Sequence, residues 1–200
     1  MKFTYSIPTK ILFGPGSFND LATTPLPGKK ALVVITAGKS MRANGYLDRL
    51  IDMLDKQGIG HALFDKILPN PVLRHVHEGA ALAREQGCDF VIGLGGGSSI
   101  DSAKSIAVMA KNPGDYWDYI SGGSGKGQPL VNGALPIVAI ATTAGTGTEA
   151  DPWTVITKED TNEKIGFGCA ETFPVLSVVD PEMMLTIPAH LTAYQGFDAL

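Results

Sequence analysis

Residues 90–104 read Phe-Val-Ile-Gly-Leu-Gly-Gly-Gly-Ser-Ser-Ile-Asp-Ser-Ala-Lys, an apolar run that leads through three consecutive glycines into a helix-forming segment. Strand, glycine turn and helix in this order present backbone N–H groups and the positive end of a helix to an anion. Because glycine has no Cβ, a phosphate can reach the main chain there. We therefore predict a phosphate-binding turn, followed by a helix over residues 102–111, with Ser98 and Asp101 forming a capping box. The alternative is a tight, well-capped turn without a ligand.

Three glycine patterns resemble nucleotide-binding motifs without matching them. The first, beginning at Gly93, fails the dinucleotide fingerprint because Ser98 stands in its last place. The second, Gly145-x-Gly147-x-x-Ala150, is followed by Asp-Pro, which disfavours the helix that the fingerprint needs. The third, residues 122–127, lacks the Ser or Thr that follows the lysine of a P-loop, and we interpret it as a flexible surface loop. The sequence thus predicts a phosphate cradle without a standard Rossmann or P-loop fingerprint.

The rest of the chain places the glycine turn in a parallel sheet. Apolar runs at 31–36, 61–64, 90–94 and 136–143 alternate with amphipathic helices at 40–57 and 72–86. Strands spaced by about 30 residues with helices between them are βαβ units, whose right-handed crossovers give a parallel sheet. We also expect short strands at 4–7, 10–13, 153–157 and 175–179, and a helical segment from Pro188 to Leu200. The predicted class is α/β.

Composition excludes several classes of protein. The chain has 200 residues, 44% of them hydrophobic, and its net charge of −4 gives no reason to expect nucleic acid or an anionic membrane as a partner. Cys88 and Cys169 make no disulfide framework, which favours a reducing, cytoplasmic location. The N-terminus lacks the apolar core of a signal peptide, and no apolar run is long enough to span a bilayer. We expect a cytoplasmic protein.

Small polar residues follow the strands whose carboxyl ends share an edge with the glycine turn: Thr36–Ser40, Asn70 and Thr142–Thr146. Such an edge is where open α/β sheets bind long nucleotides. NAD usually meets an acidic residue there, and the segment Thr36–Ser40 contains none. Lys39 and Ser40 suit a 2′-phosphate better, so we favour NADP, with Asp65 as the counter-candidate that favours NAD. No general base is identifiable.

Four separated motifs, in order over nearly the whole chain, resemble the iron-containing (group III) alcohol dehydrogenases. They are Gly-Gly-Gly-Ser98-x-x-Asp101-x-x-Lys104, Thr142-Thr-Ala-Gly-Thr-Gly-Thr-Glu149, Asp180-Pro181 and Ala193-x-x-Gly196-x-Asp198-Ala-Leu200. The resemblance implies a Rossmann-like parallel sheet flanked by helices, as in the N-terminal domain of dehydroquinate synthase. That domain would occupy residues 1–188, with 189–200 as the truncated start of an all-helical domain that is otherwise missing.

The resemblance also implies site residues. Gly96, Gly97, Ser98 and Asp101 would line the pyrophosphate and nicotinamide side, and Gly38 would occupy the position that selects between NAD and NADP. The other cofactor-binding residues implied are Thr142, Thr143 and Thr146, with Asn70 and Lys164 near them. The family's divalent metal, Fe²⁺ or Zn²⁺, is held by one Asp and three His. Asp198 matches the Asp, and the first His would lie four residues later, beyond this sequence.

The expected function is therefore the NAD(P)-binding domain of a metal-dependent alcohol dehydrogenase or aldehyde reductase, inactive alone. The parent reaction would move a hydride between NAD(P)(H) and a small primary alcohol or aldehyde. The family also leads us to expect a homodimer formed through the N-terminal strand segment. Two alternatives stay open: a domain of a glycerol dehydrogenase or dehydroquinate synthase relative, and a non-catalytic nucleotide-binding module.

Overall fold

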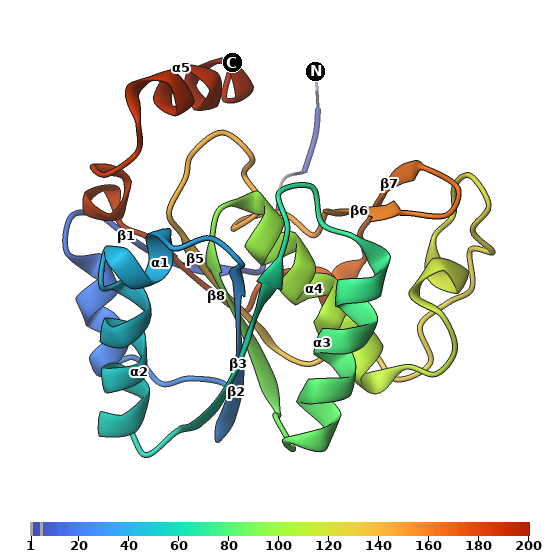
Figure 1. Ribbon diagram of the computed structural model, residues 1–200, viewed down its shortest axis with the longest axis horizontal. Coiled ribbons are helices and arrows are strands. Elements are labelled where there is room, and N and C mark those ends of the chain that lie inside the picture. Colours follow the sequence, from blue (N-terminus) through green and yellow to red (C-terminus); the bar gives the residue numbers. More distant parts are fainter. Residues whose placement is uncertain (1, 5) are drawn as a thin grey trace.

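The computed structural model, which describes residues 2–4 and 6–200, is built on a six-stranded sheet in the order β1-β8-β5-β4-β2-β3 (Figure 1). All neighbouring strands of this sheet run parallel. Its strands are β1 (Lys10–Phe13), β2 (Lys30–Thr36), β3 (Gly60–Ile67), β4 (Phe90–Gly95), β5 (Ile137–Ala141) and β8 (Leu176–Val179). An antiparallel hairpin of β6 (Thr154–Lys158) and β7 (Glu163–Phe167) stands beside it. The α/β class and the parallel sheet predicted from the sequence are confirmed.

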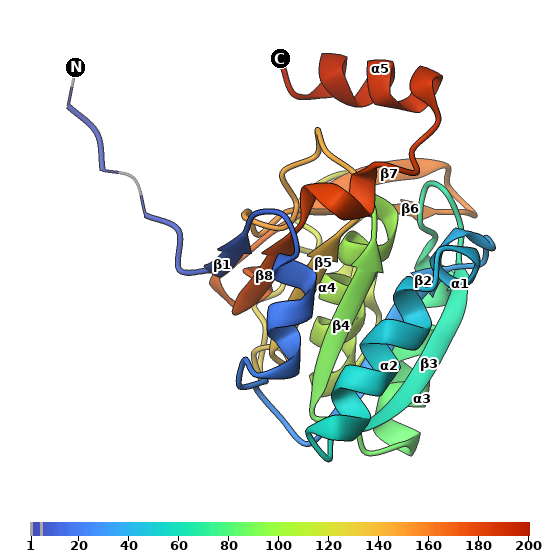
Figure 2. The same ribbon diagram turned by 90° about the vertical axis from the view of Figure 1, so that its left-hand side faces the viewer.

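Helices cover both faces of the sheet (Figures 1 and 2). The α-helices are α1 (Ser40–Ala43), α2 (Tyr46–Lys56), α3 (Leu73–Glu85), α4 (Gly97–Lys111) and α5 (Ala189–Asp198). Short 3₁₀ helices are η1 (Ser17–Ala22), η2 (Tyr116–Tyr119), η3 (Ala170–Thr172) and η4 (Pro181–Met184). Helix α2 and η1 pack on one face, whereas α3, α4 and η2 pack on the other. Among the described residues, no helix combines the length and apolarity that a membrane crossing requires.

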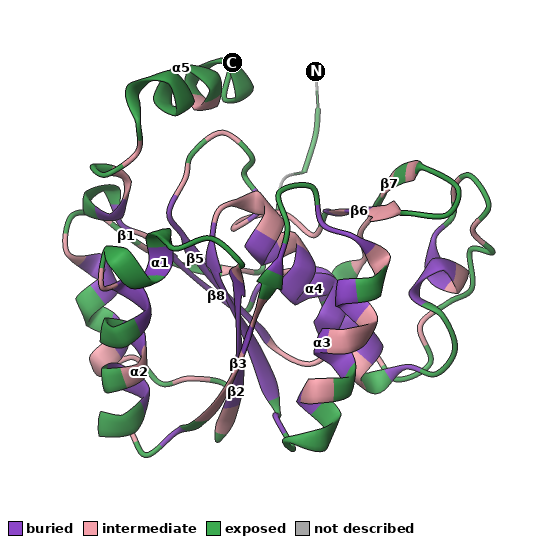
Figure 3. Ribbon diagram, in the orientation of Figure 1, coloured by how far each residue is buried: buried purple, intermediate pink, exposed green. Residues whose placement is uncertain are grey.

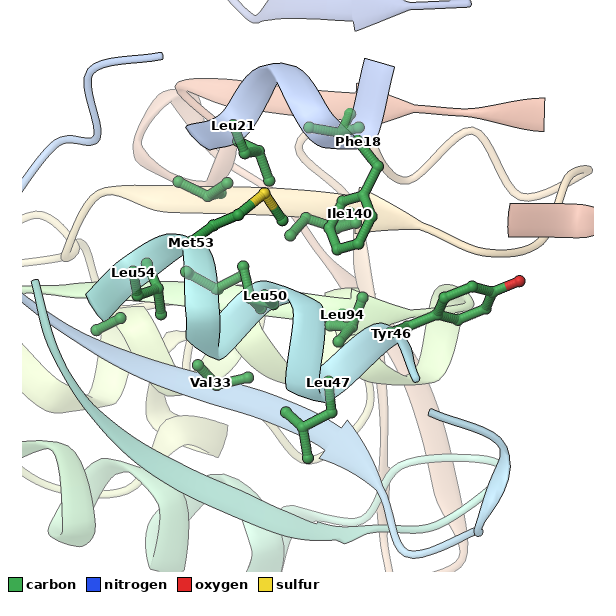
Figure 4. Close-up of a cluster of buried hydrophobic side chains, with 14 of the residues drawn as sticks. Phe18, Leu21, Val33, Tyr46, Leu47, Leu50, Met53, Leu54, Leu94 and Ile140 are labelled. Carbon is green, nitrogen blue, oxygen red and sulfur yellow. The ribbon is translucent and has the colours of Figure 1, made fainter. Parts of the chain in front are cut away.

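Alternation along the strands supplies both cores. On β2, Val33 and Ile35 point into the cluster under α2, while Leu32 and Val34 point into the cluster under α3 and α4. Helix α2 buries Leu47, Leu50, Met53 and Leu54, which recur at helical spacing (Figure 4). Each such leucine contributes about 1.5–3 kcal/mol by leaving water. The buried strands run through the middle of the molecule (Figure 3), so the carboxyl ends of β2, β4 and β5 are held rigidly at one edge.

Helix α4 lies directly against β4 because Gly93 has no side chain. A Cβ at Gly93 would stand 2.9 Å from the Cα of Ile100 and 3.0 Å from the Cβ of Ala103. This close approach fixes the start of α4 at the end of β4, where the glycine turn lies.

Two predicted elements differ from the structure. The helix expected over 40–57 is two helices, α1 and α2, because Gly45 between them has φ +71°. The strand expected over 4–7 includes Tyr5, which lies outside the described residues, and residues 4, 6 and 7 are not in a strand.

The loop at residues 122–127 is docked rather than free. The N–H and Oγ of Ser124 both donate to the carboxylate of Glu163, at 2.6 and 2.5 Å, and the N–H of Gly127 donates to the Ile120 carbonyl at 2.8 Å. The loop lies at the surface, as predicted, but these hydrogen bonds tie it to β7 and to the end of η2 instead of leaving it without contacts. A carboxylate on β7 holds it, an interaction between residues about 40 positions apart that local composition cannot reveal.

Candidate functional site

The glycine turn leaves backbone donors free at the start of a helix. β4 ends at Gly95, whose φ of +144° suits glycine, and α4 begins at Gly97. Within the part of the chain that the structure describes, the N–H groups of Gly97 and Ser98 have no hydrogen-bond partner, and both residues are partly exposed. Free N–H groups at a helix N-terminus attract anions through the helix dipole. The turn therefore offers two free N–H donors at the positive end of a helix.

The predicted capping box at this turn is wrong. Gly96, not Ser98, is the N-cap residue, and no side chain caps the helix. Asp101 instead accepts hydrogen bonds from the Oγ1 of Thr148 at 2.7 Å and from the N–H of Val155 at 3.0 Å. The helix also begins at Gly97 rather than at Ser102. Because no side chain satisfies the first N–H groups, these groups stay available to a ligand.

Residues 142–147, here called the threonine loop, form the wall opposite the turn. A Cβ at Gly96 would stand 2.8 Å from the Oγ1 of Thr143, and a Cβ at Gly97 would stand 3.1 Å from the Cγ2 of Thr146. Any side chain at these two glycines would fill the gap between helix and loop. The gap opens into a cleft of about 910 Å³, within the range of small-molecule sites. The cleft is also lined by Thr36, from the end of β2.

Helix α5 provides the outer side of the cleft. It lies apart from the sheet, above the edge that holds the turn (Figures 1 and 2), and none of its residues is buried (Figure 3). The side-chain oxygen of Gln195 accepts a hydrogen bond from the N–H of Ala144 at 2.8 Å. Asp198 sits against the threonine loop, because a Cβ at Gly145 would stand 2.9 Å from its Cβ. Asp198 therefore faces the same cleft as the turn.

A second cavity of about 160 Å³ adjoins the cleft between α1 and α5. Ser40, Thr142 and Thr143 line it together with residues of α1, η4 and α5. Gly38 lies between β2 and α1 and is exposed. Among the described residues, the one atom within 4 Å of a Cβ added there is the Oγ1 of Thr36, at 3.6 Å. The end of β2 therefore offers open space at the edge of the cleft.

Two predicted residues meet farther along the same edge. Asn70, with φ +60°, accepts a hydrogen bond from the Nζ of Lys164 at 2.8 Å, which links the start of α3 to β7. Asp65, the counter-candidate for the ribose, forms an ion pair with Arg42 at 2.6 Å. Its charge is therefore partly neutralised by a neighbour.

A buried ion network lies behind the turn and was not predicted. The side chain of Lys104 has no exposed surface, and its Nζ lies 3.2 Å from the Oδ1 of Asp151. Burial lowers the pKa of the Lys104 ammonium, while Asp151 and Asp101 oppose that shift. Burial likewise raises the pKa of the Asp101 carboxyl, against the hydrogen bonds that it accepts. One signal was available: apart from Lys104, the segment Ser102–Met109 contains only small or apolar residues, which favours a buried and paired lysine.

The residues present do not make a metal site by themselves. Among the residues that the structure describes, no group of three or more His, Cys, Asp and Glu side chains lies close enough to hold a metal ion. Asp198 is a single exposed carboxylate at the end of α5. Fe²⁺ and Zn²⁺ sites in proteins use several such ligands. The cysteines are also unsuited to nucleophilic roles, because burial raises the pKa of both thiols.

Comparison with known proteins places this geometry in a family. A sequence profile described as iron-containing alcohol dehydrogenase matches residues 8–181. The chain belongs to the iron-containing alcohol dehydrogenase family. This membership agrees with the resemblance of the four motifs, and the match includes the glycine turn and the threonine loop.

Individual members of the iron-containing alcohol dehydrogenase family are similar over nearly the whole chain. Choline dehydrogenase of Bacillus subtilis is 39% identical over 98% of this chain and 48% of its own length. NADH-dependent butanol dehydrogenase B of Clostridium acetobutylicum is 36% identical over 96% of this chain and 48% of its own. The crystal structure of NADH-dependent butanol dehydrogenase A from Thermotoga maritima superposes with a TM-score of 0.90 at 36% identity, over 98% of this chain and 48% of that one. The chain spans about half the length of the curated relatives it matches.

Proposed function

We propose that this chain is the NAD(P)-binding half of a metal-dependent alcohol dehydrogenase or aldehyde reductase. The observation that carries the proposal is the pair of N–H groups at Gly97 and Ser98, which have no hydrogen-bond partner among the described residues and lie beside the narrow gap between the glycine turn and the threonine loop. A diphosphate fits this arrangement because it can accept both hydrogen bonds and gains from the helix dipole. The names of the relatives point to the same cofactor class and to alcohols as substrates.

The dinucleotide would lie along the carboxyl edge of the sheet. Its diphosphate would bind at Gly96, Gly97 and Ser98, between β2 on one side and β5 on the other. The adenosine would extend toward Gly38 and Ser40 at the end of β2, by the usual preference of open α/β sheets. The nicotinamide would extend toward Asp101 and Asp198. Its remaining contacts would come from Thr142, Thr143, Thr146, Asn70 and Lys164.

The end of β2 bears on the choice of cofactor. The named butanol dehydrogenases use NADH, which supports NAD. No carboxylate follows β2 in the segment Thr36–Ser40, and Gly38 leaves open space beside the exposed Lys39. A 2′-phosphate would meet no negative charge in that segment. We propose that the site binds NAD(H) and also accepts NADP(H).

The bound dinucleotide supplies or accepts the hydride, and this chain's residues hold and orient it. The substrate we propose is a small primary alcohol or the corresponding aldehyde, the class to which butanol and choline belong. Because Asp198 alone does not hold a metal, we propose that Fe²⁺, or Zn²⁺ in its place, needs ligands additional to the described residues. We also propose that the α/β unit ends near Pro188 and that α5, with no buried residue, begins a separate unit.

We propose further that the protein forms a homodimer in the cytoplasm and has neither nucleic acid nor membrane as a partner. Strand β1 lies at the edge of the sheet, and Phe13 on it is 76% exposed. An unpaired edge with an exposed aromatic side chain favours association through the N-terminal segment. The net charge of −4 supports the exclusion of nucleic acid and anionic membranes.

Titration of the chain with NADH and NADPH, followed by nicotinamide fluorescence, tests the proposed function. We expect saturable binding of both, displaced by NAD and by pyrophosphate. Absence of saturation with either nucleotide at millimolar concentration would overturn the proposal. Binding that pyrophosphate does not displace would place the nucleotide away from the glycine turn.

A further inference from the structure

The Lys104 ammonium donates all three of its hydrogen bonds to one segment of the chain, residues 148–153. Its Nζ donates to the Oγ1 of Thr148, the carbonyl of Asp151 and the carbonyl of Trp153, each at 2.8 Å. An ammonium has three N–H groups, so these three acceptors satisfy it. A buried charge left unpaired costs several kcal/mol. Residues 148–153 are therefore held where the buried lysine needs them.

The direction of one hydrogen bond in this network follows from its chemistry. Lys104 only donates, so the Oγ1 of Thr148 accepts from it. The same hydroxyl lies 2.7 Å from the Oδ1 of Asp101, to which its own proton is therefore donated. Asp101 and Lys104 are three residues apart on α4 and share one side of the helix. The Thr148 hydroxyl is thus hydrogen-bonded to two residues of α4, the helix that begins at the glycine turn.

Thr148 also marks the end of the threonine loop. The loop is fixed at its start, where the N–H of Thr142 donates to the Gly95 carbonyl at 3.0 Å. Between these ends Ala144, Thr146 and Gly147 are exposed, and Gly145 and Gly147 have φ of +99° and +67°. A loop with few packing contacts takes its position from its two ends. The wall opposite the glycine turn is therefore placed by β5 at its start and by Lys104 and Asp101 just beyond its end, while Gln195 of α5 accepts a hydrogen bond from Ala144 between them.

We propose that Lys104 is a positioning residue for the dinucleotide, which acts through Thr148 to set the width of the gap between the glycine turn and the threonine loop. This inference rests on the proposed function, since it assigns the gap to a diphosphate. Lys104 touches neither the gap nor the cleft. Through Thr148 it connects two parts of the site: α4, whose first amides would donate to the diphosphate, and the threonine loop, which forms the opposite wall. This connection fixes the distance between the two walls.

The matched variants Thr148→Val and Thr148→Ser test this proposal. Valine keeps the shape of threonine but removes the hydroxyl that links Lys104 to Asp101, whereas serine keeps it. We expect the Kd for NADH to rise tenfold or more in Thr148→Val and to stay within twofold of the unchanged protein in Thr148→Ser. Lys104→Met, which removes the ammonium and keeps an unbranched side chain, should match Thr148→Val. Circular dichroism and thermal melts establish that each variant is folded at the temperature of the titration.

Each outcome supports or overturns the role proposed for Lys104. If the network only stabilises the fold, Thr148→Val should melt at a lower temperature but bind NADH with the same Kd as Thr148→Ser. That result would overturn the proposal and leave the proposed function standing. If Lys104→Met does not fold, the threonine pair still gives the answer. If the unchanged protein binds no NADH, the proposed function fails and this inference fails with it.

Discussion

Gly96→Ala tests the site with the smallest possible change. The added methyl carbon would stand 2.8 Å from the Oγ1 and 3.1 Å from the Cγ2 of Thr143. The backbone tolerates alanine, since Gly96 has φ −84° and ψ −170°. Thr143 is partly exposed and can turn away. Loss of a favourable N-cap residue costs about 1 kcal/mol, and the stiffer unfolded chain offsets about 0.4–1 kcal/mol of it. Stability should therefore change by less than about 1 kcal/mol.

The effect on binding should be much larger, because the methyl group occupies the approach to the amides of the turn. A hydrogen bond from an amide to a charged phosphate contributes about 1.5–3 kcal/mol. Loss of one such bond raises the Kd for NADH about 10- to 100-fold.

The assay is a fluorescence titration of NADH beside a urea unfolding curve. Gly60→Ala is the matched control. Gly60 is the first residue of β3, at the edge of the sheet opposite the glycine turn, and its Cβ would make only an ordinary contact, 3.4 Å from the Cγ of Lys30. If Gly96→Ala binds NADH as tightly as Gly60→Ala does, the diphosphate does not lie at this turn.

Three further perturbations probe other parts of the account. Gly93→Ala should lower the free energy of unfolding by about 1–3 kcal/mol in urea, because its Cβ would press on the backbone of Ile100; an unchanged midpoint would contradict the packing of α4 on β4. Burial, and then the charge of Arg74, hold the pKa of His75 below its ordinary value of 6.5. Since the unfolded state then binds the proton first, stability should fall as the pH drops below about 6.5, and His75→Leu should show a smaller fall in unfolding curves; an equal fall would exclude this group as the cause. Gly38→Asp should weaken NADPH at least tenfold more than NADH in parallel titrations, because a carboxylate would face the 2′-phosphate; equal weakening would place that phosphate elsewhere.

Much of the fold follows from local pattern. The apolar runs that became β2 and β4 each adjoin a segment with helical amphipathic spacing, and the run that became β5 is apolar throughout, so each strand can be recognised from its own residues and its neighbours in sequence. The glycine turn is equally local, since a strand end, consecutive glycines and a helix start are adjacent in sequence. The carboxyl-edge positions of Thr36 and Thr143 then follow from the parallel sheet.

The features that could not be predicted from the sequence are contacts between residues far apart in the chain. Ser98 and Asp101 have the spacing of a capping box, but Thr148 and Val155, about 50 residues away, bind the Asp101 carboxylate instead. The same segment supplies the acceptors of Lys104. Such contacts exist only once β4, α4 and the threonine loop are assembled, so spacing within one helix cannot report them.

The most direct measurement is a ¹H–¹⁵N spectrum of the chain titrated with NADH, with the amides of Gly96, Gly97 and Ser98 assigned. A diphosphate bound to the turn should shift the Gly97 and Ser98 amides strongly and saturably, with inorganic pyrophosphate shifting the same two signals. If these amides keep their positions while NADH saturates another part of the protein, the turn between β4 and α4 is not the cofactor site.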